Sequence, residues 1–462
     1  MPADVPEGKG SGFIHGSVMY RALGQKPPSI VDSKGHFLYA SDGREIMDAT
    51  GGVAVASIGH NHPKVKADMI KQLDTVSYCY VEFFTTPPAE KLSRMLTEST
   101  GGQMNMVFLV SSGSEAVEAA LKMARQYFVE LPEPQPQRVR FISRKQSYHG
   151  NTLGALAVGA HVGRKAIYTD MLSNNISHVS PCYPYRDMLE GETEEEYVER
   201  LAKELDDEFQ RVGPDTVCAF IAETVSGVTL GCVPAVAGYF QAMKAVCEKH
   251  GALFILDEVM TGAGRTGTFH AWEQEGVVPD LQTVAKGLGG GYSPIGALLV
   301  NRRVGDVLNG GSNKFSPGQT YHSHALACAA ALSVQEVIKE QSLVANVQKL
   351  GPYLGELLRS ALADHPNVGD IRGRGFFWAV EFVQDKRSKQ PFPAAKKLAW
   401  NLHATGVTAD YCISLIPGAG TVDGKDGDHI VLAPAYNMTA EDLETMVERT
   451  KRVVVDTLDR LG

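Results

Sequence analysis

The chain of 462 residues lacks three features that would each point to a particular class of protein. No apolar run reaches the roughly 18 residues that a membrane-spanning helix needs, so no membrane partner is expected. Lys and Arg total 44 against 53 Asp and Glu, which argues against nucleic acid as a partner. The N-terminal segment MPADVPEGKG is polar and lacks the apolar core of a signal peptide. A soluble, cytoplasmic protein is therefore expected.

Cysteine usage supports the same compartment. The seven cysteines are odd in number, include no Cys-x-x-Cys pair, and are typical of free thiols in a reducing environment. They lie at positions 79, 182, 218, 232, 247, 328 and 412. What the chain has in excess is glycine, with 47 residues and no collagen-like period, against a usual share of about 7%. This excess indicates many tight turns or places where the backbone approaches a ligand closely.

The pattern of apolar residues predicts an α/β fold. Several strand-like runs are apolar without alternation, as in strands buried on both faces of a mostly parallel sheet. The runs are 106–110, 138–143, 217–223, 252–258, 281–287 and 295–300. Helical patterns lie between them, including 115–128, behind Ser112 and Ser114 as possible N-caps, and 239–250, which ends at Gly251. The length predicts two or three packed units.

Two other regions differ from this alternation. The acidic stretch 190–207 predicts a solvated surface helix. After about residue 335 the pattern changes to long helices, short strands near 371–382 and 429–436, and a final amphipathic helix. That pattern predicts a separate, smaller α+β domain, with the Gly-rich stretch 417–428 as a loop inside it.

A glycine flanked by serines stands between a predicted strand and a predicted helix, in SSGSEAVEAA at 111–120. Backbone N–H groups and the helix dipole at such a joint form an anion site. An ordinary strand–turn–helix joint with a serine cap is the alternative.

The run ALFILDEVMTGAGRTG at 252–267 places Asp257 and Glu258 at the end of an apolar strand. Open α/β sheets bind ligands at that edge, although two solvated acids in a turn are equally consistent with the pattern. Gly262, Gly264 and Gly267 also match Gly-x-Gly-x-x-Gly, the dinucleotide fingerprint. The match is weak because five residues separate it from the strand and no convincing helix follows.

Lys286 ends another predicted strand and precedes a glycine cluster at 287–291. A lysine beside backbone that can approach a flat ligand suits a Schiff-base amine, whereas a surface lysine before a loop is the simple alternative. In QSYHGNT at 146–152, Tyr148 and His149 precede a glycine at a strand end, where a core-edge pair would also fit.

Together these four features match the needs of pyridoxal chemistry: an amine, a carboxylate for the pyridine nitrogen, an anion cradle and an aromatic face. The sequence resembles the class III aminotransferases of PLP fold type I, from DATGGVAVASIGHNHP at 48–63 to the last helix. The 29-residue spacing from Asp257 in Asp-Glu-Val to Lys286 in Ala-Lys-Gly is the most specific part of the match. The resemblance implies pyridoxal 5'-phosphate as cofactor and a mostly parallel, seven-stranded-type sheet. It also implies a large domain at 81–335 and a small domain built from 1–80 and 336–462.

The resemblance also implies roles for particular residues. Lys286 would form the internal aldimine and move the proton, and Asp257 would pair with the pyridine nitrogen. The cofactor ring would lie between Val259 and Tyr148. The remaining cofactor contacts would come from Ser112, Gly113, Ser114, His149 and Glu223, and from Thr320 of a neighbouring subunit in a homodimer. A metal pair is the alternative for His322 and His324, but no further ligand cluster accompanies them.

Departures from the family pattern bear on the substrate. Val431 stands where relatives acting on ornithine or 4-aminobutyrate carry Arg, and Asn151 replaces a second such Arg, so those specificities are disfavoured. The expected reaction is ping-pong transfer from an amine or ω-amino acid to a 2-oxo acid, pyruvate by preference. Candidates for substrate contacts are Arg186, Arg374, Phe83 and Phe84. A decarboxylase or aminomutase on the same fold, or more remotely a nicotinamide oxidoreductase, is the alternative.

Overall fold

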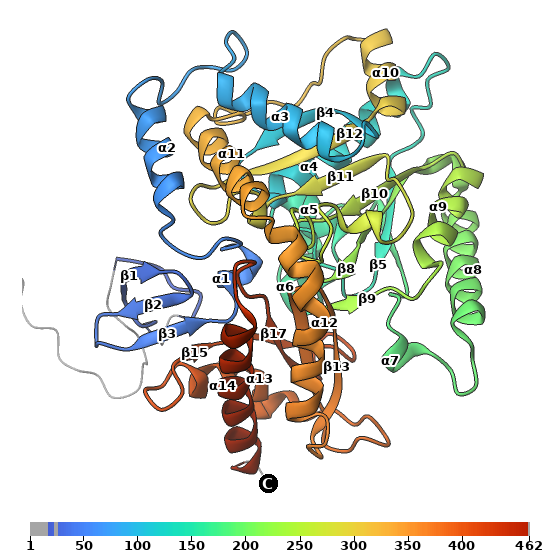
Figure 1. The fold of residues 1–462 in the computed structure, drawn as a ribbon. Coiled ribbons are helices and arrows are strands. Elements are labelled where there is room, and N and C mark those ends of the chain that lie inside the picture. Colours follow the sequence, from blue (N-terminus) through green and yellow to red (C-terminus); the bar gives the residue numbers. More distant parts are fainter. Residues whose placement is uncertain (1–16, 23–25, 461–462) are drawn as a thin grey trace, which may run out of the picture.

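The computed structural model describes residues 17–22 and 26–460, so the polar segment MPADVPEGKG lies outside the described residues. The chain forms two lobes (Figure 1). One holds a seven-stranded sheet with its helices, and the other holds two four-stranded sheets and the long C-terminal helices.

The large sheet has the order β4-β12-β11-β10-β7-β5-β6. Only β12 runs antiparallel to both neighbours, while the β11, β10, β7, β5 and β6 pairs are parallel. The mostly parallel sheet predicted from the sequence is therefore confirmed, with one strand, β6, that the sequence pattern did not show. The strands are β4 (Met104–Val110), β5 (Arg140–Arg144), β6 (Ile176–Val179), β7 (Val217–Glu223), β10 (Leu253–Asp257), β11 (Leu281–Val284) and β12 (Gly296–Asn301).

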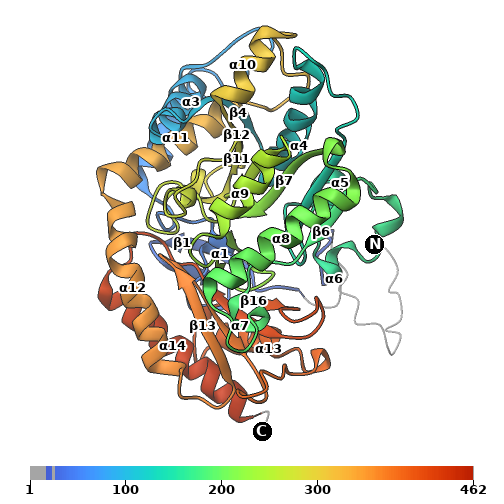
Figure 2. The same ribbon diagram turned by 90° about the vertical axis from the view of Figure 1, so that its right-hand side faces the viewer.

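Alternate residues of the central strands face opposite layers of helices, which explains why these strands are apolar throughout. Ile221 and Ile255 pack in one cluster with α4 (Gly113–Glu130). Phe220 and Phe254 pack in another with α8 (Glu194–Val212) and α9 (Tyr239–Lys249), which lie side by side in Figure 2. The acidic helix α8 is thus solvated on one face and buried on the other.

Further helices complete the large lobe. They are α3 (Pro87–Ser99), α5 (Leu153–Val158), α6 (Val162–Lys165), α7 (Pro184–Asp187), α10 (Arg302–Gly310) and α11 (Ala325–Glu340). A two-stranded ribbon of β8 (Val225–Ser226) and β9 (Val233–Pro234) stands at the edge facing the small lobe. Helices α1 (Gly51–Ala54) and α2 (Pro63–Leu73) connect the N-terminal strands to this lobe.

Both ends of the chain build the small lobe. In one sheet β3 (Glu45–Asp48) pairs in parallel with β15 (Ile413–Ser414), so the predicted α+β domain made from both chain ends is confirmed. Figure 1 shows this as blue and red segments in the same lobe. Its other elements are β1 (Ile30–Lys34), β2 (Phe37–Ala40), β13 (Val368–Arg374), β14 (Phe377–Phe382), β16 (Ile416–Ala419), β17 (Asp428–Leu432), α12 (Leu343–Leu362), α13 (Leu398–Gly406) and α14 (Ala440–Asp459).

One expectation about this lobe was wrong. The stretch 417–428 was expected to be a loop, but its first residues belong to strand β16, which pairs antiparallel with β17. Glycine and proline hide the strand in the sequence. Gly418 is required there because a Cβ at that position would overlap the His429 ring on β17.

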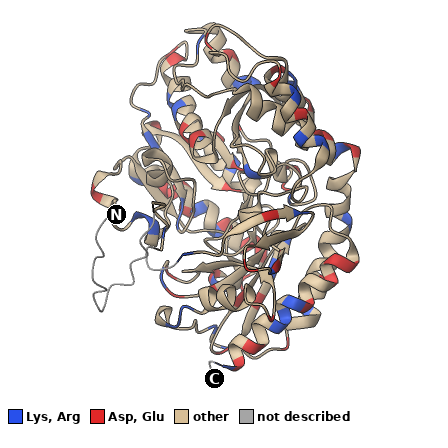
Figure 3. Cartoon of the chain, turned by 90° about the vertical axis from the view of Figure 1, so that its left-hand side faces the viewer, with Lys and Arg blue, Asp and Glu red and all other residues tan. Residues whose placement is uncertain are grey.

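Charged side chains of both signs are mixed on the outer helices. Lys and Arg are interspersed with Asp and Glu along the outer helices (Figure 3). Of the helices in the described part of the chain, none combines the length and apolarity needed to cross a membrane.

Candidate active site

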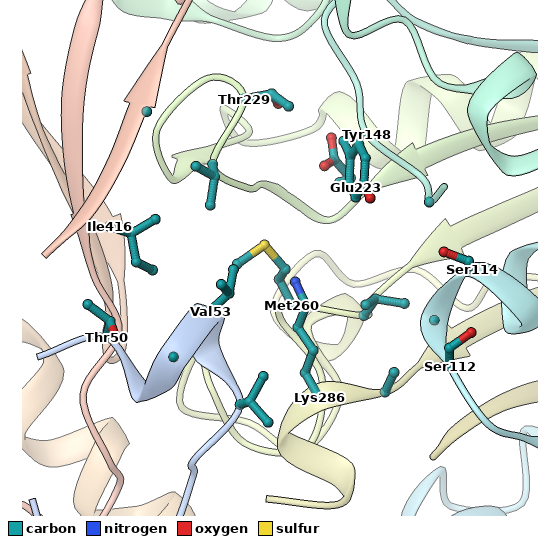
Figure 4. A pocket seen from close by; sticks show the side chains of 18 of the residues that line it. Thr50, Val53, Ser112, Ser114, Tyr148, Glu223, Thr229, Met260, Lys286 and Ile416 are labelled. Carbon is teal, nitrogen blue, oxygen red and sulfur yellow. The ribbon is translucent and has the colours of Figure 1, made fainter. Parts of the chain in front are cut away.

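A cavity of about 1000 Å³ opens at the carboxyl edge of the large sheet, where it meets the small lobe. In Figure 4, Ser112 and Ser114 lie at one end of this cavity, Thr50 and Ile416 lie at the other, and the Lys286 side chain points between them. This is the edge at which open α/β sheets bind ligands.

Three neighbouring parallel strands bring the acidic residues and the lysine together. Asp257 is the partner of Glu223 on β7 and of Thr283 on β11, so the ends of these strands are level. Lys286 is the second residue after β11 and has a left-handed φ of 45°, which is rare for a residue with a side chain. The turn directs its amine into the cavity (Figure 4).

The Asp257 carboxylate is buried, and both of its oxygens accept hydrogen bonds. Its Oδ2 lies 2.7 Å from His149 Nδ1, and its Oδ1 accepts from the Val259 N–H at 3.0 Å and the Thr283 hydroxyl at 3.2 Å. Since a carboxylate only accepts, His149 donates from Nδ1. These bonds hold the carboxylate in one orientation.

Burial gives Lys286 the properties of a reactive amine. Loss of solvent lowers its pKa from 10.5 to about 8, although the neighbouring Asp257 and Glu223 carboxylates act in the opposite direction. The neutral, nucleophilic form of the amine is therefore much more populated near physiological pH than in a solvated lysine.

The N-terminus of the 18-residue helix α4 forms one end of the cavity. Ser112 caps the helix, its Oγ accepting from the Glu115 N–H at 3.2 Å, and Ser114 Oγ accepts from the Asn151 N–H at 2.9 Å. A Cβ on Gly113 would lie 2.7 Å from Val259 Cγ1, so only glycine leaves the backbone N–H groups in place beside Val259. These are the features of an anion site.

Above the lysine, Glu223 and Tyr148 lie together (Figure 4). Burial raises the pKa of Glu223, and its Oε2 has no hydrogen-bond partner among the described residues. The guanidinium of Arg164, from α6, lies 4.7 Å from the centre of the Tyr148 ring. Arg164 and Arg21 both line the cavity.

The structure thus brings to one cavity all the predicted cofactor residues but one, namely Lys286, Asp257, Tyr148, His149, Glu223, Val259, Ser112, Gly113 and Ser114. Thr320 does not line it: it is exposed, and its carbonyl accepts from the Tyr78 hydroxyl at 3.1 Å. A role for Thr320 requires a second subunit.

The predicted substrate residues are placed elsewhere. Arg186 is bound to the buried Glu381, and Arg374 donates to Glu275 Oε1 at 2.5 Å, so neither guanidinium is available to this cavity. Phe83 and Phe84 are 74% and 62% exposed on the outer surface.

Several lining residues were not found by sequence reasoning. Arg164 and Arg21 come from segments without a recognisable motif, and Trp400 and His403 come from α13 of the small lobe. Val431 is buried in a cluster with Ile416 and does not reach the cavity, and Asn151 is exposed. The spacing of these residues carries no local signal, because the cavity is assembled from distant segments.

The alternative motifs find little support. Residues 258–270 form turns followed by a 3₁₀ turn, Ala271–Glu273, so no α-helix begins at the Gly262–Gly267 fingerprint, as a dinucleotide site requires. His322 Nδ1 lies 2.6 Å from the Gln319 carbonyl and the ring packs near Phe108. Within 17–22 and 26–460, no group of three or more His, Cys, Asp or Glu side chains could hold a metal ion.

Comparisons with known proteins agree with this geometry. The pattern of the family described as aminotransferase class-III matches residues 20–454, so the chain belongs to the class III aminotransferases. A curated protein named "Aminotransferase" from Gibberella zeae is 52% identical over 96% of this chain and 86% of its own length. Relatives at 34% and 35% identity are named as a tomato gamma aminobutyrate transaminase and a Halomonas elongata diaminobutyrate–2-oxoglutarate transaminase. Names at that distance do not agree on a donor.

Solved structures give the same result. An (S)-enantioselective omega-transaminase from Thermomicrobium roseum is 32% identical with a TM-score of 0.88, and each chain covers 96% of the other. An amine transaminase from an uncultivated Pseudomonas species, solved in a PLP-bound form, is 30% identical with a TM-score of 0.88 over 98% of this chain and 99% of its own.

The protein is therefore an aminotransferase whose cofactor is pyridoxal 5'-phosphate. The cavity fits this group on three counts. The helix N-terminus beside Gly113 suits a phosphate, the buried Asp257 carboxylate suits a protonated ring nitrogen, and the Lys286 amine suits an aldehyde.

Proposed function

We propose that this enzyme transfers the amino group of an amine or ω-amino acid to a 2-oxo acid, with pyruvate as acceptor, in a ping-pong reaction. The observation that carries the proposal is the convergence of the Lys286 amine, the Asp257 carboxylate and the N-terminus of α4 on one cavity. A carboxylate, an amine and an anion site in this arrangement suit pyridoxal phosphate and little else.

Each of these groups has a defined task. The cofactor, when bound, supplies an electron-withdrawing ring next to the reacting carbon. Asp257 would face the ring nitrogen and favour its protonated form, and His149 holds Asp257 in place through the 2.7 Å bond. Lys286 would hold the cofactor through its aldehyde and would then move the proton at the substrate carbon. Val259 and Tyr148 would hold the ring between them.

The acceptor carboxylate is assigned to Arg164, with Arg21 near it, in place of Arg186 and Arg374. Arg164 lies against the Tyr148 ring and is free of any carboxylate partner among the described residues, whereas Arg186 and Arg374 are held by Glu381 and Glu275. An arginine binds a carboxylate through two parallel hydrogen bonds, which suits recognition of a 2-oxo acid.

The opposite wall favours a donor with an uncharged tail. Between positions 400 and 419 of the small lobe, the residues that line the cavity include no Asp, Glu, Lys or Arg: they are Trp400, His403, Ser414, Leu415, Ile416, Pro417, Gly418 and Ala419. His403 places Nδ1 2.7 Å from the Leu415 carbonyl, so Nδ1 donates there and Nε2 remains an acceptor. A donor with a distal carboxylate finds no arginine or lysine on this wall.

The active site is completed in a homodimer. Two exposed aromatic side chains lie beside Thr320: Tyr78 donates to its carbonyl, and the Tyr78 and Tyr321 ring centres are 5.9 Å apart. Phe83 and Phe84, also exposed, follow Tyr78 in the sequence. Such an exposed apolar patch is typical of a subunit interface. In the dimer, Thr320 reaches the phosphate end of the partner's cavity.

All seven cysteines are free thiols, which supports a cytoplasmic location.

A donor panel tests the proposal. The purified protein is incubated with simple amines and with ω-amino acids, each with pyruvate and with 2-oxoglutarate, and the new amino acid is quantified. We expect alanine to form from pyruvate, fastest with uncharged donors. Product formation beyond one turnover per subunit in the absence of any 2-oxo acid, or transfer only from dicarboxylic donors, contradicts the proposal. Substitution of Arg164 by Met is expected to raise the KM for pyruvate about 100-fold, since it removes a charge-assisted bidentate contact worth about 3 kcal/mol.

A further inference from the structure

The turn between β8 and β9 forms part of the wall of the substrate end of the cavity. Residues 227–232 join the two strands, and Val228 and Thr229 from this turn line the cavity (Figure 4). The turn is closed by the Gly231 and Cys232 N–H groups, which donate to the Gly227 carbonyl at 3.0 and 3.1 Å. Its outward carbonyls, of Val228, Leu230 and Gly231, are left to other partners.

Two side chains of the small lobe bind these carbonyls. His429 Nε2, on β17, lies 2.7 Å from the Val228 oxygen, and because a carbonyl only accepts, His429 donates. Arg372, on β13, donates from Nε to Gly231 at 2.7 Å and from Nη2 to Leu230 at 2.5 Å. The turn belongs to the large lobe, so its position is tied to the small lobe by these three bonds.

His429 is locked in the position that makes this bond. Its side chain is fully buried and faces Gly418, its partner on β16, where a Cβ would overlap the ring. On the other side a Cβ at Gly231 would lie 2.9 Å from His429 Cδ2. The ring thus fills the gap between the turn and β16, and both of its neighbours belong to segments that reach the cavity.

The bond does not depend on pH in the working range of an enzyme. Burial, with a smaller contribution from the nearby Arg372, lowers the pKa of His429 to about 4. The neutral ring therefore keeps one N–H, which it donates to Val228.

We infer that His429 is a positioning residue for substrate recognition. It holds the turn carrying Val228 and Thr229 at a fixed separation from β16, which carries Ile416. That separation sets the width of the donor subsite, because Val228, Thr229 and Ile416 all line the cavity. The inference rests on the proposed function, since the subsite is that of the amino donor.

Arg372 anchors the other side of the turn but is not suitable for the test. Its Nη1 lies 2.7 Å from Glu381 Oε2 and 2.8 Å from Asp370 Oδ2. Removing it takes away one of the two arginine partners of the buried Glu381 carboxylate, which destabilises the lobe as well as the turn. His429 has no ionic partner within the described residues, so its replacement tests only the bond that ties the turn 227–232 to β17.

The experiment compares His429→Leu with His429→Gln in the holoenzyme. Leucine removes the donor at similar size, and glutamine keeps an N–H donor. With pyruvate as acceptor, kcat/KM is measured for butan-2-amine and for 1-phenylethylamine. We expect His429→Leu to change the ratio between the two donors by about tenfold or more, as expected when a pocket wall moves by a methyl group. His429→Gln is expected to stay within about threefold of wild type, with the absorbance of bound cofactor unchanged in both. An equal loss for both donors in His429→Leu overturns the inference, since a merely structural role lowers both alike.

A second measurement does not depend on activity or on folding of the leucine variant. In the wild-type protein, hydrogen–deuterium exchange of residues 227–232 is expected to be as slow as that of β17. In Gly418→Ala, whose new methyl group displaces the His429 ring, exchange of this turn is expected to rise at least tenfold. Fast exchange of the turn in wild type, or no change in Gly418→Ala, overturns the inference that His429 holds the turn in place. A wild-type enzyme that uses neither amine contradicts the proposed donor instead. The exchange measurement then still tests whether His429 holds the turn in place.

Discussion

Capture of the cofactor by the cofactor-free enzyme should follow the protonation of Lys286. Only the neutral amine attacks an aldehyde, and burial lowers the pKa of this lysine from 10.5 to about 8. At pH 7 a lysine with the higher value is about 0.03% neutral, and one with the lower value is about 9% neutral. The structure therefore predicts that at pH 7 the cofactor attaches to Lys286 about 300-fold faster than to a solvated lysine. The rate is expected to rise with pH and to reach half of its maximum near pH 8.

Two substitutions should move this midpoint in opposite directions. Asp257 is the negative charge that raises the pKa of Lys286 most, so Asp257→Asn is expected to lower the midpoint. Arg164 is a positive charge that lowers it, so Arg164→Met is expected to raise the midpoint. Titrations of the cofactor itself are the same in all three proteins and cancel in the comparison.

The assay mixes cofactor-free protein with pyridoxal phosphate in a stopped-flow instrument between pH 6 and 10. The absorbance of lysine-bound cofactor gives the rate, and the midpoint, rather than the amplitude, is compared between proteins. A midpoint near 10.5 in wild type refutes the role of burial. Shifts of the same sign in both variants refute the electrostatic reasoning.

Three further predictions concern other parts of the structure. Gly113→Ala places a methyl group 2.7 Å from Val259 Cγ1 and should weaken pyridoxal phosphate binding at least tenfold in an equilibrium titration, whereas Gly310→Ala, in open space, should not. Glu258→Gln should lower the free energy of unfolding, measured in urea, by roughly 2–4 kcal/mol. The buried carboxylate accepts from two backbone N–H groups at 2.7 and 2.8 Å, and the amide nitrogen of glutamine would face one of them. An unchanged unfolding midpoint contradicts this. Trp400, 58% exposed at the cavity, should report substrate binding by a fluorescence change that Trp400→Phe abolishes; a change that persists assigns the signal to the buried tryptophans.

Much of the fold and the cofactor end of the site follows from local sequence. Asp257 and Lys286 each end an apolar strand, and the carboxyl ends of parallel strands share one edge, so their meeting could be predicted without knowing the strand order. The same holds for Gly113, at a strand–helix joint. The boundaries at 80/81 and 335/336, the homodimer and the part of Thr320 in it stay predictions.

The substrate end could not be predicted in this way. Arg186 and Arg374 were candidates by residue type alone, and nothing near them in sequence shows that Glu381 and Glu275 bind their guanidinium groups. Arg164 reaches the Tyr148 ring from a four-residue helix whose placement depends on tertiary packing. Strand β16 was missed because Gly418 accommodates a histidine from the neighbouring strand, a requirement that only the paired structure reveals.

The central claim is that Lys286 and its cavity carry out amino transfer. The most direct test mixes the purified holoenzyme with an excess of an uncharged amine and no 2-oxo acid, and follows the cofactor absorbance. We predict one turnover: the absorbance of lysine-bound cofactor disappears, one carbonyl product forms per subunit, and pyruvate then restores the spectrum while alanine appears. Lys286→Ala should show no turnover. Continued product formation without pyruvate, or full turnover by Lys286→Ala, would contradict the account.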